Sequence, residues 1–204
     1  MKYVSKEKND YTPIPEGAHK VVCSAFIDLG MQEAFGATKP QFLLRLEVPD
    51  SRVDREKNGQ QVSEPMVKWQ FYTNSLNKKS NLRRDLEGIL ARGLTKDELA
   101  EGYNAPDLVG KAWQVSIIHD HSGESVKDKI SSMNKLMAGT AIPAPELPVI
   151  YYSRGLKVEE QWDLLPEWVQ NKVNEQIEDL TASQPPVNEE PFVDDAVPFN
   201  QEAA

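Results

Sequence analysis

The chain has 204 residues, of which 39% are hydrophobic, so it can bury one core of ordinary size with peripheral segments. Its single cysteine, Cys23, excludes an internal disulfide and fits a reducing compartment. The net charge of −9 at pH 7 argues against a uniformly basic nucleic-acid binder.

Residues 1–16 are expected to form an extended arm. The start, MKYVSKEKNDY, is charged and lacks the apolar segment of a signal peptide, and no stretch of the chain has the length of a membrane span. Pro13 and Pro15 favour an extended backbone. The following GAHKVVCSAFIDLG predicts a long first strand, and its alternation slips near Ser24, which indicates a β-bulge.

A second strand is predicted over QFLLRLEV, after a loop over residues 30–39. The loop holds Phe35 between two glycines, where the ring is either a lid over the core or an exposed stacking platform. Residues 51–64 are expected to form a charged hairpin connection. Its tip is predicted at Asn58-Gly59, a strong two-residue turn signal.

The third strand, VKWQFYT, is followed by a basic turn and a short helix. Trp69 and Phe71 share one face of this strand, while Lys68 and Tyr72 share the other. We expect Phe71 to belong to the core. If Trp69 also faces the core, Lys68 and Tyr72 face a binding groove together.

The turn after this strand, NSLNKKSN, leads into the helix LRRDLEGIL, which Ser80 or Asn81 can cap. Thr95 and Glu98 predict a capping box for a second short helix. Two further strands are predicted over AWQVSIIHD and over SVKDKISSM.

This order of elements predicts a mainly β fold. Three strands, a helix and two strands suit a five-stranded OB-fold-like barrel with a helix between strands 3 and 4, whose closure removes exposed edges. An unrelated small barrel, or an open sheet with a helix on one face, is the alternative. The expected divisions are an arm (1–16), an OB-fold DNA-binding domain (17–138), a proline-rich connector with an amphipathic helix packed on the barrel (139–180) and a disordered acidic tail (181–204).

The C-terminal quarter is strongly acidic. Residues 159–204 carry twelve acids and one base, which leaves 22 bases and 20 acids, a net charge of +2, for the first 158 residues. Residues 159–180 predict one helix with an apolar stripe formed by Leu165, Trp168, Val169, Val173 and Ile177.

The tail contains Asp194-Asp195-Ala196-Val197-Pro198-Phe199, acidic residues followed by Pro-Phe. This resembles the tail of bacterial single-stranded DNA-binding proteins, in which the last Phe enters a pocket on a partner protein. The motif departs from that pattern because residues 200–204 follow Phe199. The stretch Glu189-Glu190-Pro191-Phe192 is a weaker second copy.

Four further segments carry a wider resemblance, which covers residues 13–173. IPEGAHKVVCSAFIDLG, KKSNLRRDLEGILARGLTKDEL, LVGKAWQVSIIH and LPEWVQNKV together resemble the single-stranded DNA-binding proteins encoded by bacteriophages. The resemblance implies an OB-fold core that coats DNA without catalysis. It also implies a tail that recruits phage or host replication and recombination proteins in the cytoplasm of the bacterial host. Self-association stays open.

Sequence-tolerant binding of single strands uses aromatic rings for bases and cations for phosphates. The candidate stacking residues are Trp69, Tyr72, Trp113 and Phe35. The candidate phosphate contacts are Lys39, Arg45, Lys68, Lys78, Lys79, Arg83, Arg84, Lys111, Lys127 and Lys129. Trp113 is equally suited to the core.

Two other function classes were weighed. His119-Asp120-His121 could hold a metal, but it lies at a predicted hairpin tip and no nearby carboxylate or cysteine cluster completes a site. No phosphate-binding loop or nucleophile motif is present, so we expect no enzyme, metal or cofactor. The main alternative is an interaction module of a replication or recombination complex without DNA binding of its own.

Overall fold

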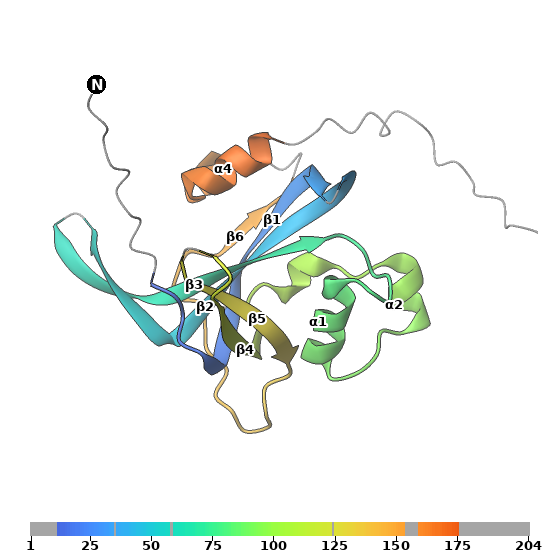
Figure 1. The fold of residues 1–204 in the computed structure, drawn as a ribbon, viewed down its shortest axis with the longest axis horizontal. Coiled ribbons are helices and arrows are strands. Elements are labelled where there is room, and N and C mark those ends of the chain that lie inside the picture. The colour runs from blue at the N-terminus through green and yellow to red at the C-terminus, as the bar shows by residue number, and fades with distance from the viewer. Residues whose placement is uncertain (1–11, 35, 58, 124, 154–158, 176–204) are drawn as a thin grey trace, which may run out of the picture.

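The structure is a computed structural model and describes residues 12–34, 36–57, 59–123, 125–153 and 159–175 (Figure 1). It is mainly β, as predicted. The strands are β1 (Gly17–Ala34), β2 (Ala37–Lys57), β3 (Gln60–Thr73), β4 (Ala112–Asp120), β5 (Lys127–Asn134) and β6 (Ile150–Tyr152). None of the helices in these ranges has the length and apolar character needed to cross a membrane.

The strands form one sheet with the order β3-β2-β1-β4-β5. Neighbours in this order pair antiparallel, whereas β6 pairs parallel with β1 beyond the end of the β1–β4 ladder. The register of β1 against β2 shifts between Cys23 and Ala25, so the predicted bulge near Ser24 is confirmed. The sixth strand was not predicted, because its segment is short and rich in proline.

The closed barrel is not confirmed, because the sheet is open. Among the described residues, β5 pairs with β4 and β3 pairs with β2, but no ladder joins β3 to β5. The connection from β3 to β4 contains α1 (Asn81–Leu90), α2 (Lys96–Glu101) and the 3₁₀ helix η1 (Ala105–Leu108), so a helix lies between these strands as predicted. Helix α1 packs beside β5 (Figure 1).

Two apolar clusters lie on opposite faces of the sheet, because side chains alternate along each strand. The inner cluster contains Val21, Leu44 and Trp113 and is completed by α1. The outer cluster packs Ile27 and Leu43 against the C-terminal helices. Cys23 belongs to the inner cluster, and burial raises the pKa of its thiol to about 12, which keeps it protonated and unreactive.

The C-terminal segment contains two short helices, α3 (Glu159–Trp162) and α4 (Glu167–Asn174), so the prediction of one continuous helix was wrong. The break falls at Pro166, which has no N–H to donate and takes the N-cap position of α4. Leu165, Val169 and Val173 are buried, whereas Trp168 is 44% exposed. Ile177 lies outside the described residues.

The connector before β6 is bound to the sheet by two buried charged residues of β2. Glu47 accepts hydrogen bonds from the main-chain N–H groups of Glu146 (2.8 Å) and Leu147 (3.2 Å). Arg45 donates to Ser24 Oγ (2.9 Å) and to the carbonyl oxygen of Pro148. Arg45 was predicted to contact phosphate, and this is wrong, because its guanidinium is buried and already bonded.

The β2–β3 hairpin is longer than expected. Residues 51–64 were predicted to be a connection, but β2 continues to Lys57 and β3 already begins at Gln60. The hairpin projects beyond the rest of the sheet (Figure 1). Lys57 pairs with Gln60, and Gly59 has a φ of +77°, so the tip lies at the predicted position.

Substitution of Gly88 by alanine tests the packing of α1 on β5. A Cβ atom at Gly88 would lie 2.1 Å from the carbonyl oxygen of Met133, whereas one at Gly93 would meet nothing within 4 Å. Alanine normally favours a helix by about 1 kcal/mol over glycine. We nevertheless expect Gly88→Ala to lower the free energy of unfolding by about 2 kcal/mol in urea denaturation, because overpacking forces α1 away from β5.

Gly93→Ala is the matched control and should change stability by less than about 0.5 kcal/mol. Equal stability of the two variants would contradict the close packing of α1 on β5.

Candidate nucleic-acid interface

A hollow of about 580 Å³ lies where β3 and β5 fail to pair. Residues from four elements line it: Lys68, Trp69, Gln70 and Phe71 of β3, Asn81 and Arg84 of α1, Ile118 of β4, and Asp128, Lys129, Ile130 and Ser131 of β5. The open sheet edge that prevents a closed barrel therefore forms one wall of a surface depression.

A second hollow of about 480 Å³ continues from the first along β3 and the start of α1. The two share Phe71 and Asn81, and the second adds Lys39, Lys79, Ser80 and the end of β3. We call the two hollows together the seam groove. Its basic side chains are Lys39, Lys68, Lys79, Arg84 and Lys129.

Phe71 lies where the two hollows meet, and its side chain is 43% exposed. The expectation that Phe71 belongs to the core was wrong. Trp69, on the same strand face, is half-buried, and its ring meets Trp168 of α4 edge-on at 5.4 Å between centroids. Phe71 also lies against Trp168, at 6.2 Å. Phe71 is therefore the exposed ring that lines the groove, and Trp168, which is 44% exposed and lines neither hollow, lies beside it.

Tyr72 lies on the opposite face of β3 and borders the second hollow, but it is nearly fully buried, so its ring is not presented to a base as expected. It is only 4% exposed, packs on Phe42, and donates a hydrogen bond from its hydroxyl to Asp85 Oδ2 (2.9 Å). Burial, reinforced by Asp85, raises the pKa of Tyr72 well above its usual value. Trp113 is fully buried as well, so neither ring is available to stack on a base.

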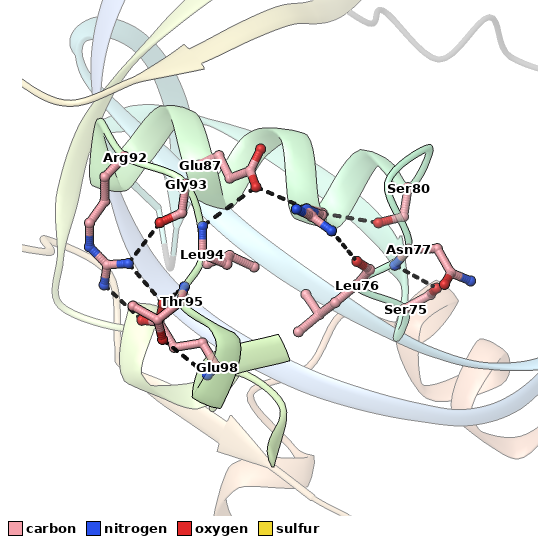
Figure 2. Close-up of polar contacts among 11 residues, drawn as sticks. Ser75, Leu76, Asn77, Ser80, Glu87, Arg92, Gly93, Leu94, Thr95 and Glu98 are labelled. Carbon is pink, nitrogen blue, oxygen red and sulfur yellow. Dashed lines mark hydrogen bonds and ion pairs between the residues drawn. The ribbon is translucent and has the colours of Figure 1, made fainter. Parts of the chain in front are cut away.

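The two arginines of α1 have different surroundings. Arg83 donates to Glu87 (2.9 Å) and to the carbonyl oxygen of Leu76, and lines neither hollow. Figure 2 shows Glu87 at the centre of this network, where it also accepts from the main-chain N–H of Leu94. Arg84 lines the seam groove and donates to Asp85.

The helices α1 and α2 begin at the capping residues that were predicted for them. Ser80 caps α1 by accepting from the main-chain N–H of Arg83 (3.2 Å), and the capping box of Thr95 and Glu98 begins α2 (Figure 2). These contacts fix the start of α1 at one wall of the seam groove.

One ion pair bridges the open edge. Lys68 Nζ lies 3.1 Å from Asp128 Oδ2 and donates a hydrogen bond to the carbonyl oxygen of Asp128 (2.6 Å). Desolvation lowers the pKa of Lys68 and raises that of Asp128. The two carboxylate oxygens of Asp128 accept no hydrogen bond within the described ranges.

Three cations of the groove form no close ion pair with a described residue, although Lys129 acts electrostatically on Asp120. No ion pair within the described ranges joins Lys39, Lys79 or Lys129 to a carboxylate. Lys78 and Lys111 are exposed but line neither hollow. The remaining predicted contacts, Phe35 and the tail residues Asp194, Asp195, Pro198 and Phe199, lie outside the described residues.

Sequence reasoning missed Gln70, Asn81, Ile118 and Asp128 as groove residues, and Trp168 as the ring next to Phe71. For Asp128 a signal was present. The run Lys127-Asp128-Lys129-Ile130 places Asp128 on the same strand face as Ile130, which is the buried face of β5. A charged residue at an apolar position of a strand marks a candidate site.

The histidine pair is part of the fold near the N-terminal segment. His119 Nε2 lies 2.8 Å from the carbonyl oxygen of Ile14, and the rings of His119 and His121 are 6.2 Å apart. Across the described ranges, no cluster of three or more histidine, cysteine or acidic side chains could hold a metal ion.

The chain matches no protein-family model, and comparison with curated proteins gives no match.

Two substitutions on β3 compare the effect of an exposed ring on DNA binding with the effect of a buried ring on stability. Phe71→Ala should weaken binding of oligo-dT by about 1–3 kcal/mol, the contribution of one stacked base, and change stability by less than about 1 kcal/mol. Tyr72→Phe should cost about 1–2 kcal/mol of stability because Asp85 Oδ2 loses its donor while Arg84 still donates to Oδ1, and it should weaken binding less than Phe71→Ala does. Fluorescence anisotropy and urea denaturation measure the two effects. Loss of binding in Tyr72→Phe alone would place the site elsewhere.

Proposed function

We propose that the protein binds single-stranded DNA with little dependence on sequence, through the seam groove. The observation that carries this proposal is the position of Phe71, an exposed ring at the junction of two hollows that are lined by cations. An unpaired base can stack on such a ring whatever its identity, while lysines on either side contact successive phosphates.

The charge distribution supports this proposal despite the acidic net charge. Lys39 and Lys79 line one hollow, and Lys129 lines the other, with Arg84 beside it. Asp128 is the one acid among the residues that line the two hollows, and it faces Lys68. The local field in the groove therefore favours a polyanion.

The arrangement of strands is compatible with an OB-fold that is open between β3 and β5. The order β3-β2-β1-β4-β5, with α1 following β3, is the order such a barrel would have before closure. We propose this fold assignment together with the function. The resemblance of residues 13–173 to phage single-stranded DNA-binding proteins supports both.

The same resemblance suggests a role in phage DNA replication or recombination in the bacterial cytoplasm. In this proposal the acidic Pro-Phe tail recruits replication or recombination proteins, as an acidic segment with isolated phenylalanines would. The tail lies outside the described residues, so the groove is the part of the proposal that the structure supports.

Charge removal tests the groove. The triple variant Lys39→Gln, Lys79→Gln, Lys129→Gln should bind oligo-dT at least about tenfold more weakly at low salt. The slope of log affinity against log salt should become shallower by about 2, because each single-strand phosphate contact contributes about 0.7. Fluorescence anisotropy across a salt series measures both quantities.

The matched control removes three exposed lysines outside the groove, at positions 57, 96 and 111. It carries the same change in net charge and should retain the wild-type salt slope. If both triple variants weaken equally, only net charge matters and the groove assignment is wrong. If the wild-type protein binds no oligonucleotide at low salt, the interaction-module alternative replaces the proposed function.

A further inference from the structure

The carboxylate of Asp128 is the most unusual group in the seam groove. Its side chain is fully buried, it lines the hollow beside Phe71, and neither oxygen accepts a hydrogen bond in the described part of the chain. Buried carboxylates are normally well hydrogen-bonded, because an unsatisfied buried charge is costly. Lys68 is the ion-pair partner of Asp128, and because both oxygens are buried, a ligand that brings two donors reaches this acceptor pair only when Lys68 turns aside.

Lys68 adds a donor next to these two acceptors. Its amino group lies 3.1 Å from Asp128 Oδ2 and lines the same hollow. The hydrogen bond that it makes goes to the carbonyl oxygen of Asp128, and its long side chain can turn toward a ligand. The pair therefore presents one donor followed by two acceptors.

Guanine has the complementary sequence of groups along its Watson–Crick edge: the O6 acceptor, the N1–H donor and the N2 amino donor. Adenine and cytosine each place a ring nitrogen acceptor beside their amino group, and that acceptor would face the Asp128 carboxylate. Thymine has a single N–H between two carbonyl oxygens. Unpaired bases on a single strand expose this edge to protein side chains.

We propose that the Lys68–Asp128 pair forms a base-reading position in the seam groove that prefers guanine. A guanine stacked near Phe71 donates from N1–H and N2–H to the carboxylate of Asp128 and accepts at O6 from Lys68. This inference rests on the proposed function. It adds one selective position to a groove that otherwise binds any sequence.

The test uses wild-type protein and a dT oligonucleotide of fixed length with one central substitution. A single dG should bind about tenfold more tightly than a single dA or dC, since a bidentate base contact discriminates by roughly five- to a hundredfold. Deoxyinosine retains N1–H and O6 but lacks the N2 amino group, so it should lose a large part of the gain. One guanine per strand avoids self-association of the DNA, and fluorescence anisotropy provides the dissociation constants.

Asp128→Asn should abolish the difference between dG and dA, measured as the ratio of the two affinities within the variant. The matched control is Asp54→Asn, the same change at an exposed position on the β2–β3 hairpin outside both hollows, and it should retain the guanine preference. The inosine comparison needs no variant, so it decides the matter even if Asp128→Asn fails to fold.

The outcomes separate the two proposals. Equal affinity for dG, dI, dA and dC, with plain oligo-dT still bound, overturns the base-reading position and leaves the proposed function intact. A guanine preference that survives in Asp128→Asn also overturns it. Absence of binding to every oligonucleotide overturns both.

Discussion

The direction in which β3 presents its side chains is the constraint on which the candidate site depends. Tyr72 is fixed inward by its hydrogen bond to the buried Asp85 and by its contact with Phe42. Because strand side chains alternate with a period of two, this anchor turns Phe71 to the outside. A shift of one residue would bury Phe71 and remove the only ring that both hollows share.

The same alternation brings Lys68 to the open edge, where it meets Asp128. Desolvation dominates the pKa shifts of both groups, so burial disfavours both charges more than their attraction compensates. As pH rises above the pKa of an unfolded aspartate, the folded protein keeps the Asp128 proton longer, so ionisation of Asp128 lowers stability. Each of the two charges is therefore disfavoured by burial at the wall of the groove.

Features that depend on neighbouring residues were predictable from the sequence. The turn at Gly59, the capping by Ser80 and the capping box at Thr95 each need only a few adjacent residues. The alternation of β3 was predicted too, but not which face is buried, because that depends on Asp85 and Phe42, which are remote in sequence. The burial of Arg45 could not be predicted for the same reason, since its hydrogen-bond partners Ser24 and Pro148 come from other parts of the chain.

The outer face of the sheet is covered, so under the proposed function a ligand would bind at the open edge. Val169 and Val173 of α4 pack on the apolar part of that face. Arg45 and Glu47 form hydrogen bonds to the connector before β6. Trp168 lies against Phe71 and is itself 44% exposed. Under the proposed function, a base stacked on Phe71 contributes only about 1–3 kcal/mol, so phosphate contacts must provide most of the affinity. Binding through this groove would therefore weaken steeply as salt rises, and specificity could arise only where a group such as Asp128 meets a base edge.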